Sequence, residues 1–281
     1  MKPMINRKYK DSLFQKLFGE DKNNALSLYN ALNNSDYTNP DELTITTIDD
    51  VVYMGIKNDT SYLIDGNLQL TEHQSTYNPN MPIRGLMYFG KLYDQYISSL
   101  DDTIYGHKLI KLPNPRYYVL YNGNGDCPER LDLKLSDAFV HPDDSHKYEW
   151  TATMLNINSG HNYKLMKACK VLDEYSLFIA KVKELKQLEK SSKDAIIKAV
   201  DYCINNNILK ECLLKNKSEV IDMVLTEYDE EKTMSALKRQ YLNQGKIAAI
   251  ISIVNQGLLT KEQGAKQLNI PVVELEKLLE K

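Results

Sequence analysis

The chain has 281 residues, of which 42% are hydrophobic and 26% are charged, and its formal net charge is −3. This balance is ordinary for a globular protein, and the length allows one large domain or two of common size. A mildly acidic chain argues against a dedicated nucleic-acid binder, which usually carries a basic surface. No apolar run approaches the roughly 18 residues of a membrane span, so no membrane partner is expected.

The first part of the chain predicts a helix followed by three strands. Apolar residues at helical spacing predict a helix over residues 11–33, divided in two near 19–21. The segment 44–53 is rich in Thr, Ile and Val, which is typical of a strand. Residues 58–64 and 67–74 predict two more strands joined by a tight turn.

The Asp65-Gly66 turn fixes the register of this hairpin. Asp-Gly between two β segments favours a two-residue type I′ turn, in which both residues have φ > 0. Pairing of Ile64 with Asn67 then continues outward until Asp59 stands opposite Glu72. Opposed side chains lie roughly 5 Å apart on one face, where two carboxylates repel each other. A divalent cation between them would remove that repulsion; the alternative is a solvated strand end with two incidental acids.

The second hairpin strand changes character along its length. Leu68, Leu70, Glu72 and Gln74 share one face, because side chains alternate along a strand. That face begins apolar and ends polar, which is typical of a strand that enters a site or leaves the core. His73 points to the other face, so we expect a structural role for its side chain rather than general-base chemistry.

Further strands and helices follow the hairpin. A helix is expected over 82–98 and a strand over 116–121, which gives the order helix, three strands, helix, strand. Additional strands are expected over 131–135 and 149–157. From residue 163 nearly everything predicts helix, with a long helix to about 190 and others near 192–206, 208–227 and 229–256. We expect a domain boundary near residue 165.

Several ordered motifs resemble known nucleases. Asp59, a short hairpin and then Glu72-His73-Gln74 resemble the PD-(D/E)XK nuclease superfamily, with Gln in the place of the usual Lys. The wider string from Glu72 to Arg84, followed by Tyr88, resembles the Rpn family of recombination-promoting nucleases, also labelled putative transposases.

The likeness to the Rpn family covers most of residues 8–165. Residues 11–18 resemble the opening helix of that family, and residues 109–123 resemble a later strand of its core. Gln15 departs from the family's pattern, in which a basic residue at that position would contact phosphate.

The resemblance implies an α+β fold. A PD-(D/E)XK restriction-endonuclease-like αβββαβ core would fill residues 1–165, and a helical region would follow in residues 166–281. It also implies a Mg²⁺-dependent endonuclease that hydrolyses phosphodiester bonds of DNA, in bacterial recombination, mobile-element biology or phage defence. The alternative is a catalytically inactive nuclease fold that acts as a DNA-binding or protein-assembly module.

The same resemblance implies roles for individual residues. Asp59 and Glu72 would ligate Mg²⁺ or another divalent cation, with the backbone carbonyl of His73 as a third oxygen. Gln74 would orient water or hydrogen-bond phosphate, without the positive charge of a lysine.

Two further residues would support this site. Arg84 would bind phosphate bidentately, with a salt bridge to Asp94 or to the site acids as the alternative. Asp11 would add a metal or supporting contact from the opening helix, with N-capping of that helix as the alternative.

The C-terminal segment resembles a helix-turn-helix in its spacing. Thr260 and Gln263 form a predicted capping box, and Pro271 opens a second helix. Glu274 and Glu276 make this second helix a poor reader of a phosphate-lined groove. We therefore expect residues 166–281 to mediate self-association, with a homodimer as the default state, rather than to read DNA.

The cysteines and the N-terminus favour a cytoplasmic protein. The four cysteines are scattered, and neither they nor the five histidines complete a zinc pattern. The basic N-terminus is followed by no apolar stretch, so no signal peptide is expected. No Walker or Rossmann glycine pattern is present, which disfavours nucleotide-cofactor chemistry.

Overall fold

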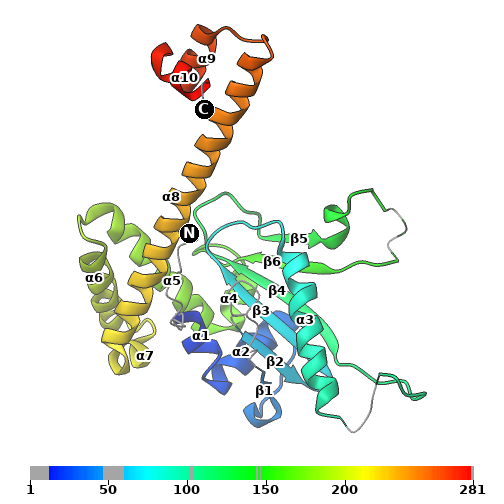
Figure 1. The fold of residues 1–281 in the computed structure, drawn as a ribbon. Helices are drawn as coiled ribbons and strands as arrows, with labels where there is room; N and C mark the ends of the chain where they lie inside the picture. The colour runs from blue at the N-terminus through cyan, green and yellow to red at the C-terminus, as the bar shows by residue number, and fades with distance from the viewer. Residues whose placement is uncertain (1–12, 47–59, 101–103, 144, 146, 280–281) are drawn as a thin grey trace. The chain divides into compact units, whose positions relative to one another are not determined.

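Figure 1 shows a computed structural model of the chain, which describes residues 13–46, 60–100, 104–143, 145 and 147–279. The chain divides into two compact units, Met1–Leu225 and Thr226–Lys281. The first unit is a mixed α+β structure built on a six-stranded sheet, as expected from the predicted order of helices and strands. The domain boundary expected near residue 165 stays a prediction.

Two short helices open the described part of the chain. Helix α1 spans Leu13–Phe18 and helix α2 spans Lys22–Asn33, with the predicted break between them. Asp21 causes the new start, because its carboxylate accepts hydrogen bonds from the backbone N–H groups of Asn23 and Asn24, at 2.9 and 3.1 Å. The side chain at this position thus satisfies donors that the helix itself cannot.

The sheet contains antiparallel and parallel strands in the order β1-β2-β3-β4-β6-β5. Strands β1, β2 and β3 form an antiparallel meander, whereas β4 runs parallel to β3, and β6 parallel to β4. Their bounds are Thr44–Ile45, Thr60–Ile64, Asn67–Gln74, Asn114–Tyr121, Arg130–Lys134 and Thr151–Asn156 for β1 to β6. Helix α3, Met81–Ser98, provides the crossover that a parallel connection needs. Short 3₁₀ turns lie at Pro40–Glu42 and Leu135–Ala138.

The hairpin of β2 and β3 has the predicted turn and register. Asp65 and Gly66 both have positive φ, 45° and 68°, as a type I′ turn requires. Ile64 pairs with Asn67, and the pairing continues to Thr60 opposite Thr71. The next pair of the predicted register would be residue 59 with Glu72. Asp59 lies outside the described residues, so its opposition to Glu72 stays a prediction.

The two faces of the sheet are covered by different helices (Figure 1). Alternation along the strands gives one face an apolar core shared with α3, with these buried residues: Leu68, Leu70, Met81, Tyr88, Phe89, Leu92, Tyr117, Val119, Tyr121 and Met154. On the other face, the Tyr62 hydroxyl donates to the carbonyl of Phe18 at the end of α1. The Tyr118 hydroxyl likewise donates to the carbonyl of Leu32 in α2. The sheet is therefore buried on both sides.

Helices follow the sheet to the end of the described chain. Their bounds are Tyr163–Ala168 for α4, Lys170–Leu188 for α5, Ser192–Asn205 for α6, Lys210–Lys215 for α7 and Lys217–Asn255 for α8. The predicted division into helices near 208–227 and 229–256 is wrong, because the chain instead breaks at Asn216 and α8 continues unbroken. No glycine or proline lies between residues 217 and 244 to interrupt it.

The second unit ends in the predicted helix pair. Helices α9, Lys261–Leu268, and α10, Val272–Leu279, follow α8. The capping box is present: the backbone N–H of Gln263 donates to the Thr260 hydroxyl at 3.2 Å, and the Thr260 N–H donates to the Gln263 amide oxygen at 2.9 Å. Gly264 allows close packing, since a Cβ there would lie 2.8 Å from a Val254 methyl and 3.1 Å from Leu275.

No helix in the described ranges is both long enough and apolar enough to cross a membrane.

Candidate active site

Glu72 is a buried carboxylate near the C-terminal end of β3. Its side chain is 1% exposed and lies on the face of the sheet that α3 covers. One oxygen, Oε1, accepts a hydrogen bond of 2.6 Å from the Tyr117 hydroxyl of β4. The other, Oε2, lies 2.5 Å from Nη2 of Arg84 on α3. Both oxygens of this carboxylate therefore have a donor.

The electrostatics of Glu72 are set by burial and by these two partners. Burial raises the pKa of Glu72, while the charge of Arg84 and the hydrogen bond from Tyr117 act in the opposite direction. Burial and the adjacent Glu72 also raise the pKa of the Tyr117 hydroxyl well above its usual range, so this group remains a donor. A charged carboxylate so far from water persists only because it is paired.

Arg84 is held mainly through Glu72. It extends from the first turns of α3, and its side chain is 19% exposed. Its other contacts are longer, with Nη2 at 3.3 Å from the Tyr88 hydroxyl, Nη1 at 3.7 Å from the sulfur of Met81, and Cζ at 5.7 Å from the centroid of the Tyr88 ring. Its Nε is buried and has no hydrogen-bond partner within the described part of the chain. The guanidinium is thus tightly bound on one side and loosely bound elsewhere.

Gln74 lies beside the same carboxylate oxygen. Its Nε2 is 3.5 Å from Oε2 of Glu72, and its backbone carbonyl accepts a hydrogen bond from the N–H of Asn122. The structure therefore brings together three of the predicted site residues, Glu72, Gln74 and Arg84. Of the two alternatives for Arg84, the ion pair is formed with the site acid and not with Asp94. Asp59 and Asp11 lie outside the described residues.

His73 lies between these residues in sequence but on the opposite face. Its ring stacks on Phe14, with centroids 5.5 Å apart, and its Nε2 is 3.1 Å from the Tyr175 hydroxyl of α5. Burial lowers the pKa of His73 from 6.5 to about 4; the side chain of Asn122 opposes this change, and the charge of Lys183 adds to it. The imidazole is therefore neutral near pH 7, and its backbone carbonyl stays the predicted metal ligand.

Lys183 of α5 secures the loops next to Gln74. Its Nζ donates to the backbone carbonyls of Asn122 and Gly123 and to Oδ1 of Asn158. Because these contacts use all three donors of an ammonium group, Lys183 acts as a clamp at the C-terminal ends of β4 and β6. Helix α5 thereby fixes the backbone to which Gln74 is hydrogen-bonded.

Neither Tyr117 nor Lys183 was predicted from the sequence. Parallel pairing of β3 with β4 places Leu70 opposite Tyr117 and Glu72 opposite Val119, so Tyr117 shares the face of Glu72. The alternation along β4 predicts which of its side chains share a face. The contact between Tyr117 and Glu72 depends also on the register between β3 and β4, which are distant in sequence. No local pattern distinguished Lys183 from the many other lysines of the helices.

The oxygen-bearing side chains at Glu72 are of the kind that ligate a divalent cation. Oε2 of Glu72 already lies 2.5 Å from the cationic guanidinium of Arg84, and the Gln74 amide is next to it. Carboxylate and amide oxygens are the ligands that hard cations such as Mg²⁺ take. No cluster of three or more His, Cys, Asp or Glu side chains with metal-binding geometry occurs among the residues whose placement is described, which do not include Asp59. The predicted metal site thus needs Asp59 to be complete.

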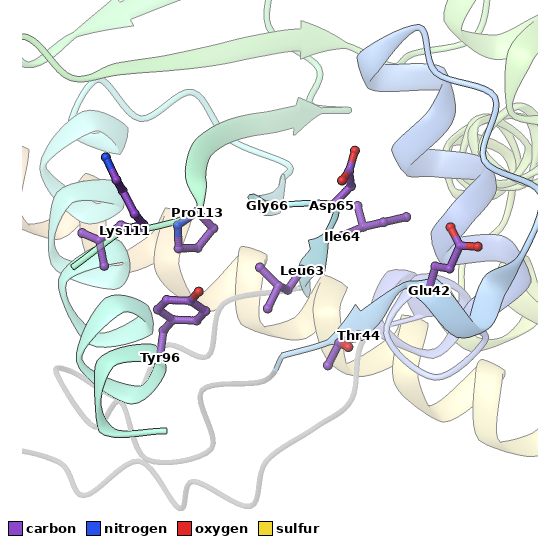
Figure 2. A pocket seen from close by; sticks show the side chains of 10 residues that line it. Glu42, Thr44, Leu63, Ile64, Asp65, Gly66, Tyr96, Lys111 and Pro113 are labelled. Carbon is purple, nitrogen blue, oxygen red and sulfur yellow. The ribbon is translucent and has the colours of Figure 1, made fainter. Parts of the chain in front are cut away.

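A separate hollow of about 410 Å³ opens at the turn end of the hairpin (Figure 2). Lys111 lies on one side of it, and Asp65 and Glu42 lie on the other. Glu72 belongs to the opposite end of β3, because the strand runs away from the turn. This hollow is therefore not part of the candidate active site.

The chemistry assigned to this site rests on the residues of the chain itself. Comparison with protein-family models, with curated proteins and with solved structures finds no match.

Proposed function

We propose that this protein is a divalent-cation-dependent DNA endonuclease with a PD-(D/E)XK-type core. The observation that carries the proposal is the position of Glu72, a buried carboxylate at the polar end of a core strand, with Gln74 and Arg84 beside it. Phosphodiester hydrolysis can use all three group types: a carboxylate to hold a metal ion, and an amide and a guanidinium to contact water or phosphate oxygens.

The arrangement of the strands supports this proposal. An opening helical segment, the antiparallel meander β1-β2-β3, the crossover helix α3 and the parallel strand β4 follow one another in the αβββαβ order that the resemblance implies. In such a core the residues just before β2 and the C-terminal end of β3 lie at the same edge of the sheet, where Asp59 and Glu72 would meet. The fold alone would not carry the function, because one fold hosts many activities.

The residues would divide the work as follows. Glu72, together with Asp59 and the carbonyl of His73, would hold Mg²⁺, which when bound lowers the pKa of a water molecule and shields charge on the attacked phosphate. Gln74 would orient the attacking water or a phosphate oxygen through its amide. Arg84 would hold a phosphate oxygen through its guanidinium. Tyr117 would keep Glu72 oriented by its hydrogen bond.

The direct test is incubation of the purified full-length protein with supercoiled plasmid. We expect nicking with Mg²⁺ and none when a chelator is added in excess, with the protein folded in both samples. Single-stranded DNA and RNA of the same sequence, in parallel samples, would define the substrate. Absence of cleavage across Mg²⁺ and Mn²⁺ would contradict the proposed activity.

One observation favours the alternative of an inactive nuclease fold. The carboxylate of Glu72 is already satisfied by Arg84 and Tyr117, so the described part of the site is stable in itself without a metal. In that case the core would serve as a DNA-binding or assembly module. DNA binding without cation-dependent cleavage, measured by fluorescence anisotropy, would support this second function.

Gln74 gives a graded prediction. If its amide only positions water or phosphate, Gln74→Lys should retain measurable nicking, because lysine is the usual residue of the wider fold. Gln74→Ala should lower the rate about 10²-fold or more, the typical effect of removing one preorganised donor. Plasmid nicking rates under saturating Mg²⁺ measure both. Full activity of the alanine variant would show that the amide has no part in the reaction.

We also propose homodimer formation, which the sequence assigns to residues 166–281, and we place it in the second unit, the last part of that region. Within it Ile250 is buried against its own neighbours, but Leu242, Leu258 and Val273 remain 65%, 70% and 63% exposed. A contiguous patch of exposed apolar side chains would mark a partner surface, and these three side chains are the candidates for it. Light scattering should give a dimer for the full chain and a monomer for a chain that ends at Leu225. A monomeric full chain would exclude the idea, as would a shortened chain that is still dimeric.

A cytoplasmic location fits the four free cysteines of the chain, since disulfides form in oxidising compartments. Cell fractionation checks this, and recovery outside the cytoplasmic fraction would contradict it.

A further inference from the structure

We propose that Arg84 occupies the cation position of Glu72 in the metal-free protein and is displaced from it when a divalent cation binds. The released guanidinium then becomes available to a phosphate oxygen of the substrate. This inference rests on the proposed function and adds regulation of the same site: the protein carries an internal competitor for its own metal.

The contact between Arg84 and Glu72 is the basis for the proposal. Nη2 lies 2.5 Å from Oε2 of Glu72, which is the oxygen that also faces the amide of Gln74 at 3.5 Å. A divalent cation coordinates carboxylate oxygens at about 2.0–2.6 Å. A divalent cation on the same carboxylate would lie close to the guanidinium, and the repulsion between their like charges would weaken the contact between Nη2 and Oε2.

The other contacts of Arg84 are suited to release. Its interactions with the Tyr88 hydroxyl, at 3.3 Å, and with the Met81 sulfur, at 3.7 Å, are long. Its buried Nε has no hydrogen-bond partner in the described part of the structure. Once the charge of Glu72 is shared with a metal, no comparably short contact holds the guanidinium in place. The side chain is also 19% exposed, so it has access to solvent.

Glu72 itself would keep its orientation during the exchange. Tyr117 donates to the other oxygen, Oε1, at 2.6 Å and is buried within the core of the sheet. The exchange therefore concerns Oε2 alone. Glu72 is thus oriented to bind a cation. Arg84, its partner in the metal-free protein, is the group that would then bind the substrate phosphate.

The proposal predicts that Arg84 weakens metal binding. We expect the dissociation constant of Mn²⁺ for full-length Arg84→Met to be about tenfold lower than for the unaltered protein, because the competing cation is gone. The same variant should cleave plasmid more slowly, since it lacks the phosphate contact. Removing the charge of Lys91, on the same helix, with Lys91→Met changes the net charge equally and should leave Mn²⁺ affinity unchanged.

Calorimetric Mn²⁺ titration of the unaltered protein, Arg84→Met and the double variant Glu72→Gln/Arg84→Met decides between the outcomes. Tighter binding by Arg84→Met that is lost in the double variant supports the exchange. If the unaltered protein and Arg84→Met bind Mn²⁺ with equal affinity and the double variant loses this binding, the exchange is overturned but the proposed metal site is not. Absence of Glu72-dependent binding in every form overturns the exchange and the metal site together.

A measurement on the unaltered protein covers the case in which Arg84→Met does not fold. The Nε–H resonance of Arg84, assigned from its loss in Arg84→Lys, should shift as Mg²⁺ saturates the site, because the guanidinium changes its partner. An unchanged resonance at saturating Mg²⁺ would overturn the exchange, and so would the same shift in Glu72→Gln.

Discussion

Replacing Glu72 by Gln should lower cation-dependent plasmid nicking by about 10²–10³-fold or more, the scale seen when one preorganised charge-stabilising group is removed. The change keeps the shape of the side chain but removes the negative charge that would hold a divalent cation. The amide oxygen of glutamine can still accept the hydrogen bond from Arg84, and its NH₂ group can donate to the Tyr117 hydroxyl, which then becomes the acceptor. We therefore expect the variant to remain folded, as judged by circular dichroism.

A matched control is available on the same hairpin. Asp65→Asn makes the same chemical change at the turn, and asparagine tolerates the positive φ of 45° found there. This variant should nick plasmid at the same rate as the unaltered protein. Asp59→Asn should behave like Glu72→Gln if the two carboxylates share one cation. Nicking at the unaltered rate by either of these two variants under Mg²⁺ would show that the site assignment is wrong.

The second large effect concerns His73 and the pH dependence of folding. The pKa of His73 is about 4 in the folded protein because burial disfavours the imidazolium, against 6.5 when the residue is free. Between these values the unfolded chain binds more protons than the folded protein. Stability from this residue is therefore complete above pH 6.5 and is lost as the pH falls toward 4. The difference in pKa corresponds to about 3 kcal/mol.

Urea unfolding at pH 7 and near pH 4 measures this contribution. Other carboxylates also titrate in this range, so the comparison is between the unaltered protein and His73→Gln, which cannot take up a proton. The unaltered protein should lose about 3 kcal/mol more than the variant on acidification. Equal losses in the unaltered protein and His73→Gln would contradict the role of burial.

Local signals in the sequence were sufficient for most of the helices and strands of the first unit. The Asp65-Gly66 turn determined the hairpin register because only a few residue pairs adopt two consecutive positive φ values readily. The capping box at Thr260 and the N-cap at Asp21 likewise act within a few residues of the chain. Such short-range interactions can be predicted because all the participating atoms belong to one segment.

The surroundings of Glu72 were decided by tertiary structure. The sequence predicted that Glu72 and Gln74 share a polar strand end, and it left two alternatives open for Arg84. The ion pair of 2.5 Å between Arg84 and Glu72 depends on where α3 crosses the sheet. The hydrogen bond from Tyr117 depends on the parallel register of β3 and β4, which no turn specifies.

The contacts of Lys183 could not be predicted from the sequence either, because they join segments that are still farther apart in the chain. Lys183 joins α5 to loops about 60 residues earlier in the chain, and nothing in its local sequence differs from that of a solvated helical lysine. The sequence by itself therefore determined the order of helices and strands, the hairpin and the polar end of β3, through contacts within short segments. Only the packing of distant segments decided which groups surround the carboxylate, because that depends on how whole helices and strands cover one another's apolar faces.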